Sequence, residues 1–585
     1  MKRILSILLI ALCTLGVQAQ FGIRVNGTDV YPATHTDDFE GFSQYLAHIY
    51  VNAGDYCELY DINNAVAWTK PLNAASVSAF SLQNNRYVCS VAGCYDFYIK
   101  IKLNADELYI GPGTGCTNTP GGGGGGGTTP TDFTSAVPSQ CTDVMLQAFY
   151  WKSNTDNTYG TTKWTVLQGQ ADEIASYFQL VWLSPSCRAK DEMGYLPSQY
   201  SNQSCRMGGS GELSSLISAL HAGGARVIAD VVINHAGSKS TWNDFFDQNF
   251  GEYGTFSPNS SWITSNDEAK DNGYSVGTNP DDGQESNANY PGTRDWDHKN
   301  TNVQAMCRAY LKWLKNVIGY DGFRFDYCGG YHVSHVNDYV SSAKPYVSVM
   351  EYWNGNASVL KQRIDDAGKN TMTFDFASFY TCYQQGLASN NYGKLKNPGL
   401  RGQGYAKYAV NFVDNHDTFN RSDINNTDCG NSTDGSTSLN NRNLILQSNA
   451  YMLSMPGIPC VFWPHWYRYK SEIKAMITAR RKAGVHSESS VSEQSGSGWY
   501  KATVNGKYGN VILYLGFAAN EAAPAGYTQA IKDGKVAMYY TGNGDPQDIE
   551  SIQPSALSNQ KFVKDGQLYI RCGERVYDAQ GKWIH

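Results

Sequence analysis

Three acidic residues, Asp326, Glu351 and Asp417, each follow a short apolar run, and carboxyl groups are the usual tools of acid–base and nucleophilic chemistry. In residues 322–327, Arg324 and Asp326 fall on one side of a strand's pleat and two phenylalanines fall on the other. Because buried charges must be paired, we expect Arg324 to hold Asp326 ionised, as a nucleophile requires. The alternative is a structural ion pair without a catalytic role.

Other apolar runs end in similar side chains. A β-branched run ends in Asn234 and His235, another run ends in His416 and Asp417, and a third ends in Glu351. Four strands that each end in chemically competent residues are typical of a parallel barrel with its site at the carboxyl-terminal rim.

Composition narrows the class of ligand. The chain has 585 residues, a formal net charge of −7 and only 17% charged residues. It has no basic tract of the kind that binds nucleic acid, so nucleic-acid binding is not expected. Aromatic residues reach 13%, with 40 Tyr and 13 Trp. This favours neutral, hydroxyl-rich ligands whose sugar rings stack on aromatic faces, and the alternative is a large aromatic core.

Residues 1–19 have the features of a secretory signal peptide. Lys2 and Arg3 precede an apolar run, and small residues around Ala19 suit cleavage before residue 20. We therefore expect a secreted protein, extracellular or periplasmic, that is monomeric and has no membrane span. The signal holds one of the 14 cysteines, so the remaining 13 cannot all pair internally.

The chain then changes character several times. Residues 20–117 predict an all-β sandwich, which is either a glycan-binding module with Trp68 and Tyr60 as a stacking platform or a structural module. In this module Cys57, Cys89, Cys94 and Cys116 are candidates for disulfides whose pairing stays open. Residues 118–140 include seven consecutive glycines and predict a flexible linker.

Residues 141–486 alternate strands with helices. Strands are expected at 144–149, 180–185, 227–234, 322–326, 347–351, 373–376, 409–415 and 458–462, and helices at 164–178, 213–221 and 303–318. This order predicts an α/β fold, a (β/α)8 TIM barrel, with a subdomain inserted after strand 3 at about 236–300. Residues 487–585 have short strands with turn dipeptides and predict a C-terminal antiparallel β-domain.

With these motifs in place, the chain resembles the α-amylase family of glycoside hydrolases, especially the plant and bacterial α-amylases. The resemblance covers residues 141–485, with a looser match to the end, and rests on four motifs in the family's order: DVVINH at 230–235, GFRFD at 322–326, EYW at 351–353 and FVDNHD at 412–417. One such motif is weak evidence, whereas four in order are specific.

The resemblance implies a role for each acid. Asp326 would be the nucleophile, Glu351 the general acid and base, and Asp417 the residue that binds sugar hydroxyls and stabilises the transition state. A retaining glycosidase needs two carboxyl groups about 5–5.5 Å apart, one ionised and one protonated. We therefore expect Glu351 to titrate high beside a second carboxylate.

The resemblance also implies contacts to substrate and to a metal. His235 and His416 would donate hydrogen bonds to the sugar, Tyr195 would stack on it, and Arg324 would support the nucleophile. A structural Ca²⁺ would tie the inserted segment to the barrel through oxygen ligands. Its candidate ligands are Asn234, Asp281, Asp295 and the carbonyl of Gly330; alternatively, the Asp-rich stretch is a solvated loop.

One position departs from the family pattern. Gly329 stands where many relatives carry a lysine, so a polar contact on the leaving-group side is absent from that position. The expected function is endo-hydrolysis of internal α-1,4-glucosidic bonds in starch or glycogen. The alternatives are a maltooligosaccharide-forming, transglycosylating or debranching relative, and a non-catalytic glucan-binding protein.

Overall fold

The computed structural model of the protein describes residues 21–112 with gaps, 132–284, 292–419, 441–544 and four strands between 559 and 584. The chain divides into two compact units, Met1–Thr129 and Pro130–His585. The signal-peptide prediction and the glycine run lie outside the described residues. Within them, no helix combines the length and apolar character that a membrane crossing requires.

The first unit is all-β, as predicted. One sheet has the order β2-β1-β5-β8-β7 with β6 beside β5, and the other has the order β10-β9-β4-β3. Their bounds are β1 Phe21–Val25, β2 Asp29–Pro32, β3 Thr34–Phe39, β4 Phe42–Val51, β5 Tyr56–Asp61, β6 Val66–Ala67, β7 Phe80–Gln83, β8 Arg86–Cys89, β9 Gly93–Ile101 and β10 Glu107–Pro112.

Alternation along these strands builds one core from both sheets. In β4, Tyr45, Ala47, Ile49 and Val51 are buried, as the two-residue period of a strand requires. The cysteines Cys57 and Cys89 also lie in this core. Of the proposed stacking platform, Trp68 is outside the described residues.

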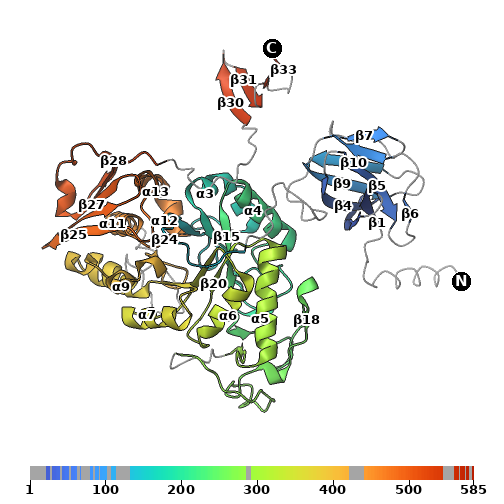
Figure 1. The fold of residues 1–585 in the computed structure, drawn as a ribbon, viewed down its shortest axis with the longest axis horizontal. Coiled ribbons are helices and arrows are strands. Elements are labelled where there is room, and N and C mark those ends of the chain that lie inside the picture. The colour runs from blue at the N-terminus through green and yellow to red at the C-terminus, as the bar shows by residue number, and fades with distance from the viewer. Residues whose placement is uncertain are drawn as a thin grey trace. The chain divides into compact units, whose positions relative to one another are not determined.

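The second unit contains the predicted barrel. Eight parallel strands close in the order of the sequence (Figure 1): β11 Met145–Gln147, β12 Leu180–Trp182, β15 Arg226–Val231, β20 Gly322–Phe325, β21 Val347–Met350, β22 Met372–Phe374, β23 Ala409–Phe412 and β24 Ile458–Phe462. Pairing of Met145 with Cys460 joins the last strand to the first. The prediction of a (β/α)8 barrel is therefore confirmed.

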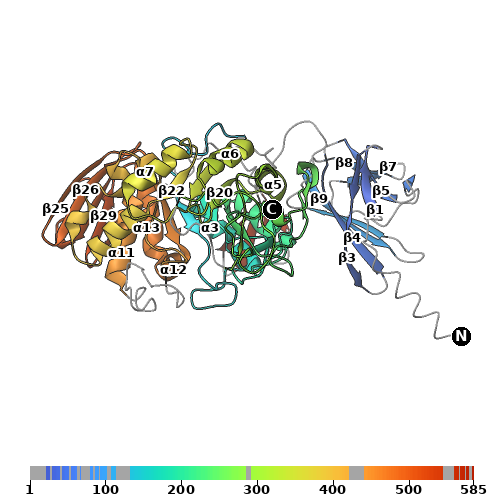
Figure 2. The same ribbon diagram turned by 90° about the horizontal axis from the view of Figure 1, so that it is seen from below.

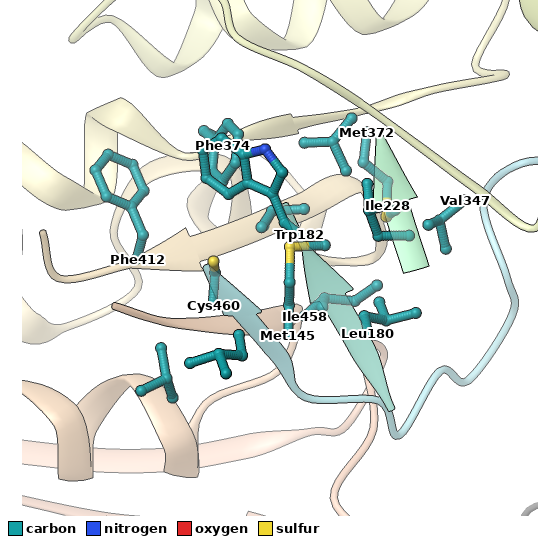
Figure 3. Close-up of a cluster of buried hydrophobic side chains, with 14 of the residues drawn as sticks. Met145, Leu180, Trp182, Ile228, Val347, Met372, Phe374, Phe412, Ile458 and Cys460 are labelled. Atoms are coloured by element: carbon teal, nitrogen blue, oxygen red, sulfur yellow. The ribbon is translucent and has the colours of Figure 1, made fainter. Parts of the chain in front are cut away.

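Large apolar side chains fill the barrel, so it is a packed core rather than a pore. Figure 3 shows Met145, Trp182, Phe374, Ile458 and Cys460 meeting from four strands, because the last two both belong to β24. All five are at most 2% exposed. This packing fixes the strand ends that carry the polar residues.

Helices follow the strands as expected, with two differences. The helix predicted at 164–178 is two helices, α2 Trp164–Gln168 and α3 Ala171–Tyr177, because the chain turns at Gly169 and Gln170. The one predicted at 303–318 is α5 Thr301–Trp313 followed by a π-helical turn, Leu314–Ile318. The others include α4 Ser210–Ala222, α6 Ser334–Ala343, α7 Ala357–Asp366, α8 Phe376–Ser378, α9 Gly399–Gly402, α11 Arg442–Ser454, α12 Trp463–Arg468 and α13 Lys470–Ala483.

The segment between β15 and α5 is irregular, as predicted for an insertion. Its described part holds short strand pairs, β16 His235–Ala236 with β19 Arg294–Asp295 and β17 Gln248–Asn249 with β18 Thr255–Phe256, and two 3-10 turns, Gly251–Tyr253 and Ser260–Trp262. The pairing of β16 with β19 joins the residues that follow β15 directly to the C-terminal end of the inserted segment.

The C-terminal region is antiparallel β, as predicted. Five strands, β25 Val491–Gly496, β26 Trp499–Asn505, β27 Asn510–Gly516, β28 Thr528–Asp533 and β29 Val536–Tyr540, form one sheet that packs on α11 and α13 (Figure 2). Its inward residues, such as Leu513 and Met538, belong to the same core as the barrel. A second sheet has β30 Asn559–Lys564, β31 Gln567–Cys572, β32 Arg575–Asp578 and β33 Trp583–Ile584.

Candidate active site

The predicted acids lie at the carboxyl ends of barrel strands. Asp326 directly follows β20, Glu351 directly follows β21, and Asp417 follows β23 by five residues. Parallel strands bring these ends to one rim. The barrel hydrogen-bond ladder reaches the first two, because Asp326 N donates to Val231 O (3.0 Å) and Glu351 N donates to Phe325 O (2.9 Å).

Arg324 is the centre of the site. Its Nη1 donates to Asp326 Oδ1 and to Asp230 Oδ1, each at 2.7 Å. Its Nη2 lies 2.7 Å from Glu351 Oε1, a charge–charge contact in which the N–H is not aligned as in a hydrogen bond. Arg324 is 1% exposed. One buried cation therefore gathers three carboxyl groups.

Asp230 completes this cluster, although no role was predicted for it from the sequence. Its Oδ2 accepts hydrogen bonds from Trp182 Nε1 (3.0 Å) and from the Tyr195 hydroxyl (2.8 Å). The Trp182 ring also lies 4.9 Å from the Arg324 guanidinium carbon. The sequence could have indicated a role for Asp230, because a carboxylate inside a β-branched strand would be costly to bury without a partner.

Aromatic rings connect Asp417 to this cluster. His416 stacks on Tyr195, with ring centroids 5.0 Å apart and planes at 7°, and on Trp151 at 6.2 Å. His416 Nδ1 lies 2.9 Å from Gln147 Nε2, and its Nε2 lies 3.2 Å from Asp417 Oδ2. The two predicted substrate contacts Tyr195 and His416 are thus held beside the third acid.

His235 joins the site through the backbone. Its Nε2 lies 2.9 Å from the carbonyl oxygen of Tyr195. The Tyr195 loop is further fixed by Asp191, whose carboxylate accepts hydrogen bonds from the backbone N–H groups of residues 193–196. The ring of Tyr195 is therefore oriented before any ligand binds.

The charge state of the cluster differs from the simple expectation that Arg324 holds Asp326 ionised. Burial raises the pKa of Asp326 well above its usual range, Arg324 opposes this, and Glu351, Asp230 and Asp417 raise the pKa further. Burial likewise raises the pKa of Asp230 to about 6, against Arg324. Three carboxyl groups share one guanidinium, so the group as a whole retains a proton more readily than isolated carboxyls do.

The residues predicted to bind a metal lie along the joint between barrel and insertion. Asn234 Nδ2 donates to Asp295 Oδ1 at 3.3 Å. Gly330 packs so closely on Asn234 that a Cβ at this glycine would collide with the amide oxygen. The structure thus brings Asn234, Asp295 and Gly330 together. Asp281 is held by its own loop, where Oδ1 accepts from Gly283 N at 2.6 Å, and its Oδ2 is buried without a hydrogen bond.

Trp353 is a feature of the site rim whose role was not predicted from the sequence. It lies two residues after Glu351 and is 39% exposed, which is unusual for tryptophan. Its ring stacks on Phe376 at 4.6 Å, and its Nε1 donates to the Tyr380 hydroxyl at 2.7 Å. An exposed aromatic face is thus held rigidly near the second acid.

Comparisons with known proteins agree with this geometry. The sequence profile "Alpha amylase, catalytic domain" matches residues 177–377. The chain is 30% identical over 377 residues to probable α-amylase 2 of Arabidopsis thaliana, which covers 60% of this chain and 82% of that protein. It is 27% identical over 467 residues to glucan 1,4-α-maltotetraohydrolase of Stutzerimonas stutzeri, which covers 74% of this chain and 79% of that protein.

The solved structure of a γ-CGTase from alkalophilic Bacillus clarkii shares the fold, with a TM-score of 0.50 and 13% identity over 78% of this chain and 83% of that one. An eight-stranded parallel barrel with acids gathered at its carboxyl-terminal rim, matched by these relatives, defines a (β/α)8-barrel glycoside hydrolase. The chain belongs to the α-amylase family.

Proposed function

We propose that this hydrolase is an α-amylase that cleaves internal α-1,4-glucosidic bonds of starch or glycogen with retention of configuration. The observation that carries the proposal is the single guanidinium of Arg324 in contact with both Asp326 and Glu351. Two carboxyl groups bound to one guanidinium are close enough for the retaining arrangement, which needs about 5–5.5 Å.

The proposal assigns a residue to each step. Asp326 attacks the anomeric carbon and forms a covalent glycosyl–enzyme ester, while Glu351 donates its proton to the departing glycosidic oxygen. Glu351 then removes a proton from water, which attacks the anomeric carbon and releases Asp326.

The surrounding residues bind the sugar. Asp417 holds hydroxyl groups and stabilises the positive charge of the oxocarbenium-like transition state. Tyr195 stacks on the ring of the sugar that is cleaved, and His416 donates a hydrogen bond to it. The stacked arrangement of Tyr195 and His416 supports this, because it fixes both side chains along one wall of the site. His235 would donate to the same sugar only by exchanging its Nε2 contact with the Tyr195 carbonyl for a sugar hydroxyl.

On the leaving-group side, Trp353 provides a binding surface that Gly329 does not. An indole fixed by Phe376 and Tyr380 offers a sugar one flat face at little entropic cost. We infer that affinity for the departing part of the chain comes from stacking rather than from a charged contact.

The structural Ca²⁺ suggested by the sequence fits the residues present. Asn234, Asp295, Asp281 and the Gly330 carbonyl offer the oxygen ligands that Ca²⁺ prefers. The buried, unbonded Asp281 Oδ2 suits a cation, and burial raises the pKa of Asp281 to about 6. Among the described residues no cluster of three His, Cys, Asp or Glu side chains would hold a metal, so the amide and the carbonyl are needed. When bound, the ion would tie the insertion to the barrel.

A second candidate function is release of short maltooligosaccharides of fixed length. It is favoured by the similarity to maltotetraohydrolases over 74% of this chain. Transglycosylation and debranching use the same acids and differ from hydrolysis of α-1,4 bonds in the acceptor or the linkage. Non-catalytic glucan binding is disfavoured, because the trio of acids is intact and lies at one rim.

We further propose secretion, directed by residues 1–19, a monomeric state, and glycan binding by the first unit. One observation limits the glycan-binding role. The Arg24 guanidinium lies 4.7 Å from the centroid of the Tyr60 ring and covers one of its faces. Any stacking by Tyr60 must therefore use the other face. Retention of the full chain on insoluble starch, compared with a chain lacking residues 20–129, tests this role.

The product profile from soluble starch tests the proposed function. An endo-acting α-amylase releases a broad mixture of oligosaccharides early in the reaction, and their new reducing ends have the α configuration by NMR. A single dominant product would favour the maltooligosaccharide-forming function. Initial β products would overturn the retaining mechanism, and the absence of new reducing ends would favour a binding protein.

A further inference from the structure

A closed set of hydrogen bonds shapes the turn that carries Asp417. Asn415 Oδ1 accepts from the backbone N–H groups of Asp417 and Thr418, both at 2.8 Å. In return, the Thr418 hydroxyl oxygen accepts from Asn415 N at 2.9 Å. This reciprocal pair fixes the backbone of Asp417 relative to the end of β23.

A buried polar chain lies behind this turn. The Thr418 hydroxyl also contacts Asp414 Oδ1 at 3.3 Å. Asp414 Oδ2 lies 3.1 Å from His465 Nε2, although the N–H is not aligned as in an ideal hydrogen bond. His465 Nδ1 in turn lies 3.2 Å from Asn449 Nδ2. Asp414, Thr418, His465 and Asn449 are at most 1% exposed.

This buried series of polar side chains connects three separate elements of the fold. Asp414 and Thr418 follow β23, His465 is in α12 after β24, and Asn449 is in α11. The rings of Phe462 and Phe419 pack on the edge of the imidazole, at 5.7 and 6.5 Å. The imidazole is therefore held in one orientation by apolar neighbours and by polar contacts at both nitrogens.

Stability alone does not account for such a set. Replacing both partners of a buried polar contact by apolar groups of the same shape can be nearly neutral for stability, since both polar groups lose their hydration on burial. Such a polar contact does fix the orientation of its side chains, because its hydrogen bonds form in only one geometry. Here that geometry is transmitted through Thr418 and Asn415 to the backbone of Asp417.

We propose that His465 and Asp414 are positioning residues that orient Asp417 for the reaction. The assignment rests on the proposed role of Asp417 as the acid that stabilises the transition state. An error of about 1 Å in the position of a catalytic group can cost about 10²-fold in rate. His465 is completely buried in α12, behind the turn, so its effect on the reaction is exerted through the turn.

The test combines His465→Phe and His465→Gln with Asp417→Asn. Phenylalanine keeps a ring but has no nitrogen, whereas glutamine keeps an amide N–H near the position of Nε2. We expect His465→Phe to lower kcat on soluble starch by about 10- to 100-fold with little change in KM, the pattern of an interaction lost only in the transition state. His465→Gln should recover most of kcat.

The double variant separates positioning from a general loss of structure. The substrate is a maltooligosaccharide fluoride, whose reactive leaving group keeps the rates of slow variants measurable. In the Asp417→Asn background, His465→Phe should lower kcat by less than about 3-fold, because the two changes remove one shared interaction. Thr418→Val, which keeps the shape and removes the linking hydroxyl, should behave as His465→Phe does.

The outcomes are distinguishable. Equal loss from His465→Phe in both backgrounds, or failure of His465→Gln to recover activity while its melting temperature is normal, would overturn the positioning role and leave the proposed function intact. Wild-type kcat in Asp417→Asn would overturn the role of Asp417 itself, and the positioning role with it.

Discussion

Arg324 Nη2 lies 2.7 Å from Glu351 Oε1, so the cation that was expected to serve the nucleophile is also in contact with the acid. The same side chain donates to Asp326 and Asp230. The charge of Arg324 is thus divided among three carboxyl groups, and a change in either Asp230 or Glu351 alters the protonation of Asp326.

The first prediction concerns Glu351→Gln. Glutamine keeps the shape but cannot donate a proton, so hydrolysis of starch should fall by about 10²- to 10⁴-fold, the usual contribution of general acid catalysis. Glycosyl–enzyme formation from a maltooligosaccharide fluoride, which needs no proton for its leaving group, should be much less affected. Stopped-flow release of fluoride measures this first step.

Asp326→Asn is the control for that experiment. It removes the nucleophile, so it should abolish activity on starch and on the fluoride alike while the circular dichroism spectrum stays that of the parent. Equal loss of both substrates in Glu351→Gln, or survival of either in Asp326→Asn, would contradict the assigned roles.

A second prediction follows from the raised pKa of Asp326. Burial raises it, the charge of Asp230 adds to the rise, and Arg324 lowers it. Asp230→Asn removes a negative neighbour and leaves Arg324 with one partner fewer, so the pKa of Asp326 should fall. Because the nucleophile must be ionised, the acid limb of kcat/KM should move to lower pH.

The pH–rate profile of kcat/KM on soluble starch checks this shift. Asp143→Asn is the matched control, since Asp143 is also a buried aspartate of the barrel but bonds to Tyr346, away from the cluster. It should leave the acid limb unchanged. A shift of the limb to higher pH in Asp230→Asn would show that Asp230 supports the ionised nucleophile instead.

The sequence predicted the strand order and the end at which the acids lie, because each motif couples an apolar run to a polar residue at its end. It did not predict the sharing of Arg324, since contact of its side chain with β15 and β21 depends on the register of these neighbouring strands, which pairs Asp230 directly with Arg324. The break at Gly169 was missed because helical spacing of apolar residues continues through it. Trp353 belongs to a motif visible in the sequence, but its exposure depends on Phe376 and Tyr380.

A third prediction addresses the calcium proposal. A chelator should lower the melting temperature, because the ligands Asn234, Asp281 and Asp295 would lose the ion that offsets their burial, and added Ca²⁺ should restore it. Asp281→Asn should reduce the difference between chelated and calcium-loaded protein. Differential scanning calorimetry measures both effects.

Asp172→Asn, a change in the first turn of α3 away from the insertion, is the control and should leave the calcium dependence intact. If the chelator has no effect on the parent protein, Asp281 does not hold calcium, and its buried oxygen needs a different explanation.

The last prediction concerns Trp353→Ala. If stacking of one sugar on the indole is worth as much as an aromatic pair, about 0.5–1.5 kcal/mol, kcat/KM on long glucans should fall by roughly 3- to 10-fold. Since the lost contact lies on the leaving-group side, release of fluoride from a maltooligosaccharide fluoride, which has no sugar there, should change little. Transfer to added maltose, which must bind on that side, should fall with the starch activity.

Trp499→Ala provides the matched control for that change, because Trp499 is a partly exposed tryptophan of β26 in the C-terminal sheet, remote in sequence from the acids. It should leave both activities at the parent level. Equal losses on starch and on the fluoride in Trp353→Ala would place the indole on the side of the cleaved sugar, where it would act with Tyr195. No loss on either substrate would mean that the exposed face of Trp353 is not used in binding, and that affinity beyond the cleaved bond comes from other residues of the rim.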